Sequence, residues 1–585
     1  CLVDADYLDT ELFMKPLQSE LRGNYPDLAT LKKRFDEYID NKQKISDDTP
    51  INRKRNFILQ TCRNKAVINP GFFSLNVPTG GGKTLSSMAF AIEHALKNGK
   101  RRIIMAIPYT SIIEQTAKVY KYGSDDEEEI KKNIKAGKVL FGEESVLEHH
   151  SNIDPEKITA LSNLSTENWD APIIVTTNVQ LFESLFASRP SDCRKLHNIV
   201  NSVIILDEAQ MLPPEYLKSI LSVLQGLVEY FGVSVVLCTA TQPAFEGIIG
   251  SQGVRFQGLQ DVIPIIEDPE KLADDFKRVE IEIPPDLTIL SSWEEIADKL
   301  IEHEQVICIV NRRNDCRALH SLMPRGTIHL SALMCGEERS NIISGIKSDL
   351  RKGKSVRVVS TQLVEAGVDI DFPVVYRALA GMDSIAQAAG RCNREGRLNK
   401  VNKTGKVVVF NPPEPAPIGL LRKGEDASKS LLRLRNEIEL KPDLFHEYFK
   451  TFYASVNDFD KAKFSERLVK ESGEFKFQFR TFAKEFKLID DKAQKGIIVW
   501  YKGEKYNSTE LIEDLKNFGP SPKLLRTLQR FTVNVPERIF NKLADDGFIS
   551  DSDTHGYAVQ FREELYEPGT GLMYDPVWDS SSLVI

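Results

Sequence analysis

The segment Val77–Thr84 reads V-P-T-G-G-G-K-T, a combination of residues suited to holding phosphate groups. Three glycines stand together in it: Gly80, Gly81 and Gly82. They let backbone N–H groups turn toward phosphate oxygens without Cβ clashes, and the helix expected over Leu85–Lys97 adds its dipole. Lys83 would reach the β- and γ-phosphates of ATP, and Thr84 would ligate Mg²⁺. A ligand-free β-turn is the alternative, which the G-K-T ending in a strand–loop–helix setting disfavours.

A second group, Asp207-Glu-Ala-Gln210, follows the apolar strand expected over Val203–Leu206. A carboxylate at the carboxyl end of a parallel strand points into the crevice where ligands bind. Asp207 would hold Mg²⁺, usually through water, and Glu208 would orient and deprotonate the attacking water. An acidic pair that only begins a helix is the alternative. Because the pair comes about 120 residues after the glycine loop, on a later strand of the same domain, we predict one shared nucleotide site.

A third group, Gln387–Arg394, reads Q-A-A-G-R-C-N-R and predicts a helix. Gln387, Arg391 and Arg394 would share one face of it, at positions i, i+4 and i+7. A basic helical face that is only solvated is the alternative. An arginine brought from a second domain onto the γ-phosphate stabilises the charge that develops during hydrolysis, an effect of about 10³–10⁵ in rate. It would also make hydrolysis depend on domain closure, as a motor requires, so we predict two arginine fingers.

Alternating apolar strands and amphipathic helices position these groups. Strands are expected in a first series at Arg102–Pro108, Ile173–Thr177, Val203–Glu208 and Val233–Thr241. A second series is expected at Gln305–Asn311, Thr327–Ser331, Val356–Thr361, Val374–Ala378 and Lys406–Phe410. This alternation predicts an α/β protein with two parallel sheets and right-handed crossovers. The expected segments are the end of a preceding domain (1–20), a helical connector (21–66), a first α/β domain (67–270), a second (271–415), a helical linker (416–489) and a small α+β accessory domain (490–585).

Composition narrows the class of protein. A chain of 585 residues is too long for one hydrophobic core, and 27% charged residues are typical of a globular protein. No apolar run approaches the roughly 18 residues of a membrane span, so no membrane partner is expected. The eight cysteines form no C-x-x-C pair, which disfavours a disulfide framework or a zinc site and indicates a reducing, cytoplasmic setting. The net charge of −8 does not favour nucleic-acid binding, although a motor needs only a local basic groove.

The residues at further strand ends resemble motifs of the superfamily 2 helicases. The motor of these proteins consists of two tandem RecA-like domains. Pro108-Tyr-Thr-Ser111 resembles motif Ia, Thr239-Ala-Thr241 resembles motif III, and Thr361–Asp369 (T-Q-L-V-E-A-G-V-D) resembles motif V. The Gln387–Arg394 segment resembles motif VI. Hydroxyls and backbone amides at strand ends suit phosphate binding, which grips a strand without reading its bases.

This resemblance implies roles for individual residues. The implied nucleic-acid contacts are Pro108, Thr110, Thr176, Thr177, Gln180, Ser331, Thr361 and Gln362. Thr239 and Thr241 would couple the ATP site to the strand groove, and Asp369 would face the nucleotide. Each short motif alone is also compatible with an ordinary turn or cap, but the ordered set fits the two-domain motor.

Three segments resemble the type I CRISPR-associated helicase–nuclease more specifically: P-T-G-G-G-K-T, D-E-A-Q, and L-V-E-A-G-V-D-I-D-F with Q-A-A-G-R-C-N-R-E-G. The resemblance covers about residues 50–415, and Leu524–Val535 is similar less specifically. It implies ATP-dependent 3′-to-5′ movement on single-stranded DNA. It also implies recruitment by the RNA-guided Cascade surveillance complex, so that target DNA is unwound for degradation. Another superfamily 2 DNA or RNA helicase, or an ATP-switched nucleic-acid-binding scaffold, remains the alternative.

The chain departs from that family at its N-terminus. Cys1-Leu-Val-Asp-Ala-Asp6 resembles the last motif of the family's HD nuclease domain, but no His-Asp dipeptide occurs in the sequence. Asp4 and Asp6 alone cannot assemble a two-metal site. We therefore expect no DNA cleavage by this chain, and a nuclease domain or subunit as its partner; Cys1 in place of Met suggests a start inside a longer protein. His149 and His150 lack partners at ligand spacing in the sequence and are expected to be surface or strand-contact residues.

Overall fold

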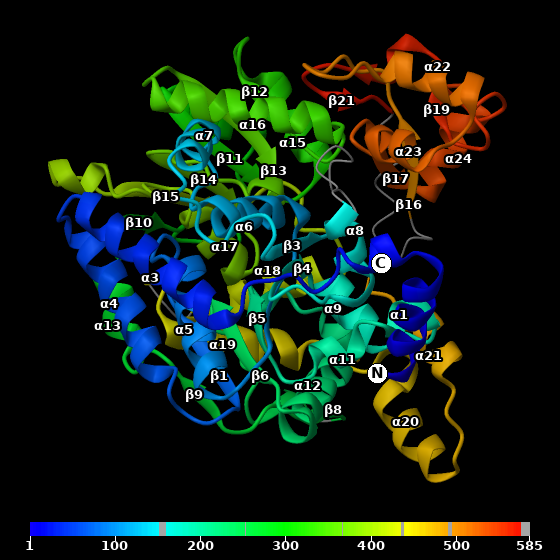
Figure 1. Ribbon diagram of the computed structural model, residues 1–585. Coiled ribbons are helices and arrows are strands. Elements are labelled where there is room, and N and C mark those ends of the chain that lie inside the picture. Colours follow the sequence, from blue (N-terminus) through cyan, green and yellow to red (C-terminus); the bar gives the residue numbers. More distant parts are fainter. Residues whose placement is uncertain (151–159, 252, 366, 434–437, 489–493, 575–585) are drawn as a thin grey trace. The chain divides into compact units, whose positions relative to one another are not determined.

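The computed structural model describes residues 1–150, 160–251, 253–365, 367–433, 438–488 and 494–574 (Figure 1). Two compact units make up the chain: Cys1–Phe276 with Lys441–Ile489, and Lys277–Leu440 with Asp490–Ile585. Each unit contains a parallel sheet, which confirms the predicted α/β class with two tandem RecA-like domains. The segment expected as one helical linker, 416–489, is divided between the two units.

The first unit is built on seven parallel strands. Their order is β3 (Val146–His149), β4 (Ile173–Thr177), β2 (Arg102–Ile107), β5 (Ser202–Asp207), β6 (Ser234–Thr239), β1 (Phe72–Asn76) and β9 (Val262–Pro264). Strands β2, β5 and β6 are buried along almost their whole length because helices cover both faces of the sheet. All strands run the same way, so the carboxyl ends of β1, β5 and β6 lie at one edge.

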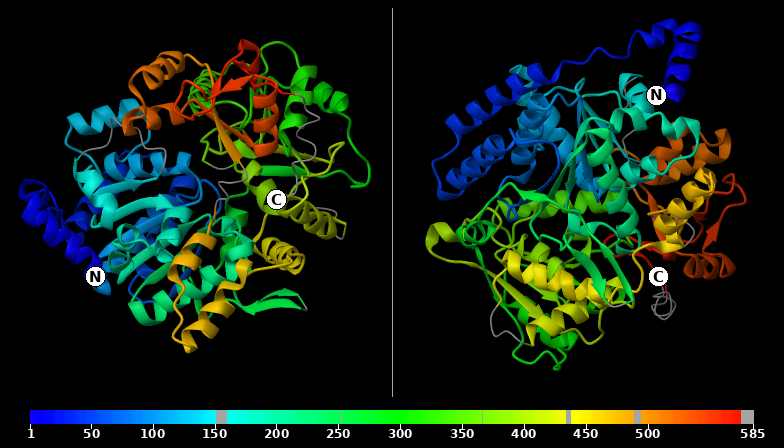
Figure 2. Two further views of the ribbon diagram at one scale, coloured as in Figure 1. Left: turned by 90° about the vertical axis from the view of Figure 1, so that its right-hand side faces the viewer. Right: turned by 90° about the horizontal axis from the view of Figure 1, so that it is seen from below.

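Helices on one face share a core with β1, β2, β5 and β6. They are α3 (Leu28–Ile45), α4 (Pro50–Lys65), α5 (Lys83–Lys97), α6 (Thr110–Tyr122) and α13 (Pro269–Asp275). Figures 1 and 2 show a second layer on the other face, formed by α9 (Asn178–Leu185), α11 (Leu196–Ile199) and α12 (Leu217–Phe231). The later segment also returns to this unit, through α19 (Pro442–Ala454), α20 (Phe464–Gly473) and α21 (Phe479–Glu485).

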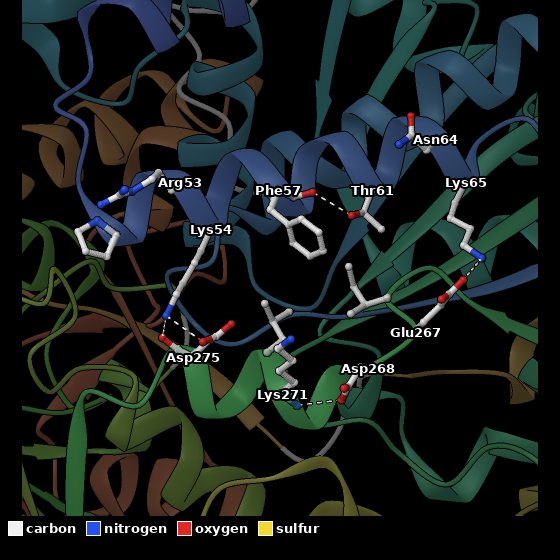
Figure 3. A pocket seen from close by; sticks show the side chains of 13 residues that line it. Arg53, Lys54, Phe57, Thr61, Asn64, Lys65, Glu267, Asp268, Lys271 and Asp275 are labelled. Atoms are coloured by element: carbon white, nitrogen blue, oxygen red, sulfur yellow. Dashed lines mark hydrogen bonds and ion pairs between the residues drawn. The ribbon is translucent and has the colours of Figure 1, made fainter.

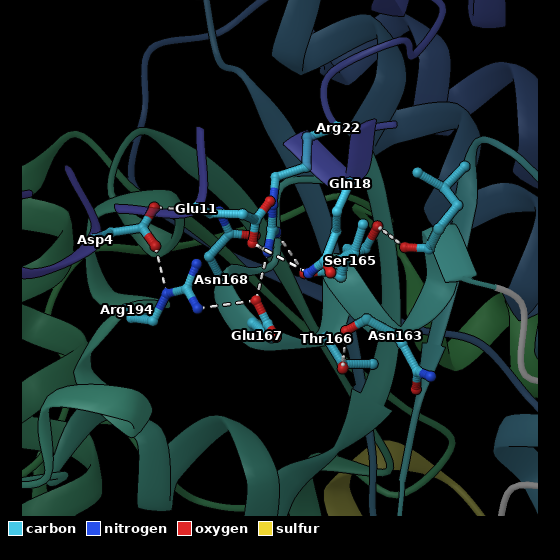
Figure 4. Close-up of polar contacts among 12 residues, drawn as sticks. Asp4, Glu11, Gln18, Arg22, Asn163, Ser165, Thr166, Glu167, Asn168 and Arg194 are labelled. Carbon is cyan, nitrogen blue, oxygen red and sulfur yellow. Dashed lines mark hydrogen bonds and ion pairs between the residues drawn. The ribbon is translucent and has the colours of Figure 1, made fainter. Parts of the chain in front are cut away.

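The N-terminal helices α1 (Leu2–Met14) and α2 (Pro16–Ser19) are fixed to the first unit by a buried ionic network (Figure 4). Asp4 is only 2% exposed, and its carboxylate accepts from Arg194 Nε at 2.6 Å and from Asn168 Nδ2 at 3.1 Å. Arg22 joins Glu11 to this site through a 2.7 Å hydrogen bond. Since a charge is expensive to bury without a partner, Arg194 is what allows Asp4 to lie there.

The second unit contains six parallel strands and a separate C-terminal module. The strand order is β10 (Val279–Glu282), β15 (Gly405–Phe410), β14 (Val374–Ala378), β11 (Gln305–Val310), β13 (Val356–Thr361) and β12 (Ile328–Leu330). Its helices are α14 (Trp293–Ile301), α15 (Arg313–Leu322), α16 (Gly336–Arg351), α17 (Met382–Ala389) and α18 (Leu420–Leu432). Apolar clusters cover both faces of the sheet.

The C-terminal module has a four-stranded mixed sheet in the order β17 (Thr532–Pro536), β16 (Gln494–Ile498), β19 (Val559–Gln560) and β18 (Ile549–Ser550). Helices α22 (Ser508–Phe518), α23 (Pro522–Gln529) and α24 (Glu537–Asp545) complete it, followed by the hairpin β20 (Tyr566–Glu567) and β21 (Gly571–Leu572). Within the described ranges, no helix combines the length and apolar character needed to cross a membrane.

Candidate active site

The glycine loop lies between the end of β1 and the start of α5, with Gly82 as the N-cap. Gly80 and Gly82 have φ values of +80° and +86°, a region in which side chains are strained. A Cβ on Gly81 would lie 2.5 Å from Val77 Cγ1. Arg55 on α4 fixes the loop from outside, since its Nε donates to Gly80 O at 2.9 Å. Positive φ therefore favours glycine at positions 80 and 82, and the contact with Val77 favours it at position 81. The amides of the loop lie at a helix N-terminus, where anions bind.

The two carboxylates follow directly at the end of β5. Glu208 has φ +49°, so the chain turns sharply after Asp207. Lys83 Nζ lies 2.8 Å from Glu208 Oε1, and both side chains are largely buried. Burial opposes the charge of Lys83, but Glu208 and Asp207 more than offset this and raise its pKa. The structure thus brings Lys83 and Glu208 together from segments more than a hundred residues apart.

Asp207 is suited to a divalent cation. Burial raises its pKa to about 6, although the nearby Lys83 opposes this shift. Its Oδ1 atom is buried and has no hydrogen-bond partner among the residues that the structure describes. A buried carboxylate oxygen without a donor, beside an ammonium group and a glycine loop, fits Mg²⁺ bound with a nucleoside triphosphate. Thr84 is the second residue of α5, directly after Lys83.

A chain of hydrogen bonds leads from this site to the next strand end. Gln210 Nε2 donates to Glu208 Oε2 at 2.6 Å, and Gln210 Oε1 accepts from Thr239 Oγ1 at 2.5 Å. Thr239 Oγ1 in turn accepts from the backbone N–H of Thr241 at 2.9 Å. The residues of the D-E-A-Q and T-A-T segments therefore form one network. No role was predicted for Gln210 from the sequence. Its position two residues after Glu208 was the feature that could have indicated this contact.

The helix predicted over Gln387–Arg394 is wrong beyond Ala389. Helix α17 ends there, and Arg391 already lies in a turn whose N–H bonds to Ala388 O. Asn393 adopts φ +44°, a conformation that a helix excludes. The backbone of this turn instead pairs with Phe372, in the segment before β14. Gln387 alone of the three predicted residues is helical, so the i, i+4, i+7 face does not exist.

The two arginines of this turn have different surroundings. Arg391 is 7% exposed, and its guanidinium donates to Val364 O at 2.8 Å and to Glu365 O at 2.6 Å. Arg394 is more accessible, and its Nε lies 2.9 Å from Asp369 Oδ1, itself 37% exposed. Arg391 therefore fastens the turn after β13, whereas Arg394 and Asp369 form a pair that a ligand could reach. The roles of both arginines as fingers, and of Asp369 at the nucleotide, remain predictions.

The predicted strand contacts of the first unit lie at the carboxyl ends of β2 and β4. Pro108 and Thr110 are partly exposed where α6 begins. Thr176 is fully buried, and its hydroxyl donates to His149 O at 2.9 Å. Thr177 accepts from the N–H of Gln180 at 2.9 Å and so caps α9. The hydroxyls of Thr176 and Thr177 are thus used for hydrogen bonds within the protein. Backbone groups and the side chain of Gln180 remain able to bind a phosphate.

A similar arrangement holds in the second unit. Ser331 is fully buried, and its Oγ accepts from the N–H of Leu333 at 3.2 Å. Thr361 ends β13 and is 5% exposed. Gln362 is partly exposed, and its Nε2 donates to Asn311 O at 2.9 Å. The assignment of these residues to nucleic-acid binding stays a prediction. We expect the loops that they hold in place to make the contacts with the strand.

Of the two histidines, His149 on β3 is partly exposed and His150 is buried. His149 accepts from Trp169 Nε1 at 2.9 Å, and burial lowers its pKa to about 3. His150 lies with Glu114 and Glu148 in a group whose ligand atoms are within 4.8 Å of one another. His150 Nε2 is 2.9 Å from Glu148 Oε1, and Lys121 Nζ is 3.3 Å from the other oxygen. Because two nitrogen groups already bond this carboxylate, the group is a polar network that requires no ion.

A cavity of about 960 Å³ lies between α4 and α13 in the first unit (Figure 3). Its apolar lining residues include Phe57 and Leu272. Ion pairs close its two ends, Lys54 with Asp275 and Lys65 with Glu267. The basic groups of its rim are thus largely compensated, and the cavity shares no lining residue with the glycine loop.

Comparisons with known proteins agree with this geometry. The DEAD/DEAH box helicase family matches residues 53–247, and the family described as CRISPR-associated nuclease/helicase Cas3, C-terminal, matches residues 302–397. A CRISPR-associated nuclease/helicase Cas3 of Haloferax volcanii is 24% identical over 498 residues, which cover 66% of this chain and 53% of that protein. The chain therefore spans about half the length of this relative.

Solved structures share the fold at low sequence identity. The T. fusca Cas3-ADP crystal structure has a TM-score of 0.61 at 16% identity, covering 92% of this chain and 71% of that one. A chain of a CRISPR RNA-guided surveillance complex, pre-nicking, has a TM-score of 0.51 at 17% identity, covering 87% and 69%. With a DEAD box region followed by a Cas3 C-terminal region, and with this fold, the chain belongs to the Cas3 helicase family.

Proposed function

We propose that this chain is a cytoplasmic ATP-driven motor that moves 3′-to-5′ along single-stranded DNA and unwinds target DNA in CRISPR interference. The observation that carries the proposal is the site at the end of β5. There Lys83 meets Glu208 at 2.8 Å beside the glycine loop, and a buried oxygen of Asp207 has no partner among the described residues. Such a set binds and positions a nucleoside triphosphate, and the hydrogen-bond chain to Thr241 connects it to a predicted coupling segment.

The residues divide the work of hydrolysis. Lys83 is paired with Glu208, so a γ-phosphate that draws Lys83 away would free the Glu208 carboxylate to take a proton from water. Asp207 and Thr84 would hold Mg²⁺, which when bound neutralises charge on the phosphates. Arg394, the more exposed of the two arginines, supplies positive charge to the transferred group, and Gln387 lies nearby in the sequence on α17.

The proposed partners follow from the relatives. The curated relative is named a CRISPR-associated nuclease/helicase, and one structural relative is a chain of an RNA-guided surveillance complex. We infer that a Cascade complex recruits this chain to opened target DNA and that a nuclease domain or subunit degrades the unwound strand. Duplex opening costs about 1.4 kcal/mol per base-pair step, which directional pulling driven by ATP can supply.

ATP hydrolysis measured with single-stranded DNA, single-stranded RNA or neither tests this function. We expect stimulation by DNA, loss of turnover in Lys83→Ala, and a loss of about 10²–10⁴-fold in Glu208→Gln with ATP binding retained. Glu229→Gln, an exposed carboxylate on α12 in the same unit, is the matched control and should behave as wild type. Preference for RNA would favour another superfamily 2 helicase, and no hydrolysis with either strand would favour the scaffold.

Direction and cleavage need their own substrates. Duplexes with a 3′ or a 5′ single-stranded overhang should be opened from the 3′ overhang only, with ATP. We expect the same purified chain to leave single-stranded DNA uncut when Mn²⁺ or Co²⁺ is added, because the segment around Asp4 and Asp6 offers too few metal ligands. Cleavage that survives in Lys83→Ala would show that expectation to be wrong.

A further inference from the structure

The loop of residues 331–335 connects β12 to α16 and is held by two different cores. Leu333 and Cys335 belong to the apolar core of the C-terminal module, whereas Met334 belongs to the core of the second parallel sheet. All three side chains are fully buried. The loop is therefore the seam at which the module joins the second RecA-like domain.

Backbone contacts between the hairpin β20–β21 and this loop are close. Leu572 N donates to Leu333 O at 2.8 Å, which adds the hairpin to the edge of the loop. Gly571 has φ +84°, and a Cβ there would lie 2.5 Å from Leu333 O. No residue other than glycine fits this approach without displacing the loop.

Tyr566 and Glu338 lock the other end of the loop. The hydroxyl of Tyr566 accepts the N–H of Cys335 at 2.9 Å and donates to Glu338 Oε2. The second oxygen of Glu338 accepts from Gly569 N at 2.6 Å. Tyr566 is 5% exposed and Glu338 is 2% exposed, so water cannot replace these bonds. Burial raises the pKa of Glu338, and Tyr566 and Gly569 oppose this rise by bonding its ionised form.

A second contact fixes the start of α16 from the side of α23. Arg530 Nε donates to Glu337 Oε2 at 2.8 Å, and Arg530 O accepts from Glu337 N at 2.9 Å. Glu337 is 4% exposed. The first turn of α16 therefore receives its bonding partners from the C-terminal module rather than from the domain to which it belongs.

We propose that the C-terminal module positions the loop 331–335 for strand binding, with Tyr566 and Glu338 as its positioning residues. The inference rests on the proposed function together with the predicted nucleic-acid contact at Ser331, where the loop begins. Two hydrogen bonds from the module reach the loop itself, at Leu333 O and Cys335 N. Further bonds from the module hold Glu337 and Glu338 in the first turn of α16, so the loop moves only together with the module. The module thus sets the affinity of the second domain for the strand and leaves the nucleotide site unchanged.

Tyr566→Phe in the full chain tests this proposal, because it removes one hydroxyl and keeps the packing of the ring. Two readouts are needed: hydrogen exchange over 333–341, and ATPase activity as a function of single-stranded DNA concentration. Losing a buried hydrogen bond corresponds to about 5- to 150-fold faster exchange at the Cys335 amide. We expect at least a fivefold rise in the half-saturating DNA concentration, with maximal turnover within twofold of wild type. Tyr557→Phe, the same change at a 37% exposed tyrosine of the module, is the control and should alter neither readout.

The outcomes separate the positioning role from the motor itself. If wild-type hydrolysis does not respond to DNA, the proposed function fails, while exchange still reports whether Tyr566 holds the loop. If DNA stimulates wild type and Tyr566→Phe leaves the half-saturating concentration unchanged, the positioning proposal is overturned, whatever the exchange shows. A fall in maximal turnover without a change in DNA affinity overturns it as well. Glu338→Gln, which weakens the same bonds from the other side, should reproduce the effect of Tyr566→Phe.

Discussion

Replacing Arg391 and Arg394 one at a time should separate a structural arginine from a catalytic one. Both belong to the segment that resembles motif VI, and the sequence predicted the same role for them. In the structure Arg391 is buried against two carbonyl oxygens, whereas Arg394 makes one partly exposed ion pair with Asp369. We therefore expect Arg394→Ala to lose hydrolysis with little loss of stability, and Arg391→Ala to lose stability.

The magnitudes follow from these contacts. A hydrogen bond from a charged donor contributes about 1.5–3 kcal/mol, so the two bonds of Arg391 amount to about 3–6 kcal/mol of unfolding free energy. The Arg394–Asp369 pair is 23% and 37% exposed, and pairs of this kind contribute under about 1 kcal/mol. As a finger, however, Arg394 would lower the barrier to hydrolysis by about 4–7 kcal/mol, equal to 10³–10⁵ in kcat.

Urea unfolding followed by near-ultraviolet circular dichroism gives the stabilities, and steady-state ATPase at saturating ATP and single-stranded DNA gives kcat. Arg394→Lys tests whether charge alone suffices; we expect partial recovery, because an ammonium lacks the planar fork of a guanidinium. Arg397→Ala, at an exposed arginine three residues beyond Arg394, is the matched control. If Arg394→Ala retains kcat within tenfold of wild type, Arg394 is not a finger and the reasoning from its exposure is refuted.

Three other changes have expected outcomes. Burial raises the pKa of Asp315 from 3.8 to about 7, so the folded state loses stability as the pH rises from about 4 to about 7. Asp315→Asn should therefore raise the free energy of urea unfolding by about 4 kcal/mol at pH 8.5 and change it little at pH 4. An equal gain at both pH values would contradict this. Arg194→Met leaves the Asp4 carboxylate buried without its cation, which should lower the free energy of unfolding by about 3–5 kcal/mol. Limited proteolysis should then release residues 1–22 first. An unchanged cleavage pattern would argue against the role of the ionic network. Gly81→Ala places a Cβ 2.5 Å from Val77 Cγ1, so ATP affinity measured by calorimetry should fall at least tenfold. Gly226→Ala, on α12 with no atom within 4 Å of the added Cβ, is the control and should leave the affinity unchanged.

The sequence predicted the two-sheet fold and most of its strands because buried parallel strands are short, apolar and followed by turn residues. Ile173–Thr177, Val356–Thr361 and Val374–Ala378 agree with β4, β13 and β14 to the residue. The helix over Gln387–Arg394 was wrong because Gln387, Ala388 and Ala389 favour a helix, whereas Gly390, the C-cap of α17, does not continue it. Beyond Gly390 the backbone pairs with Phe372 instead. Propensity alone carries no information about such a distant partner.

The predicted strand contacts show a second limit of sequence patterns. A threonine or serine at the carboxyl end of a parallel strand can offer its hydroxyl to a phosphate or use it to hold the next turn, and both uses favour the same residue in the same place. Burial distinguishes them here: the hydroxyls of Thr176 and Ser331 are inside the protein and bonded to backbone groups of their own unit. A motor that grips phosphates without reading bases needs loops of fixed shape more than it needs exposed hydroxyls, because backbone amides can supply the bonds. Replacing Ser331 by alanine should therefore weaken DNA binding through loss of loop order, and hydrogen exchange at Leu333 should increase together with the half-saturating DNA concentration. Weaker binding with unchanged exchange would mean that the hydroxyl reaches the strand itself.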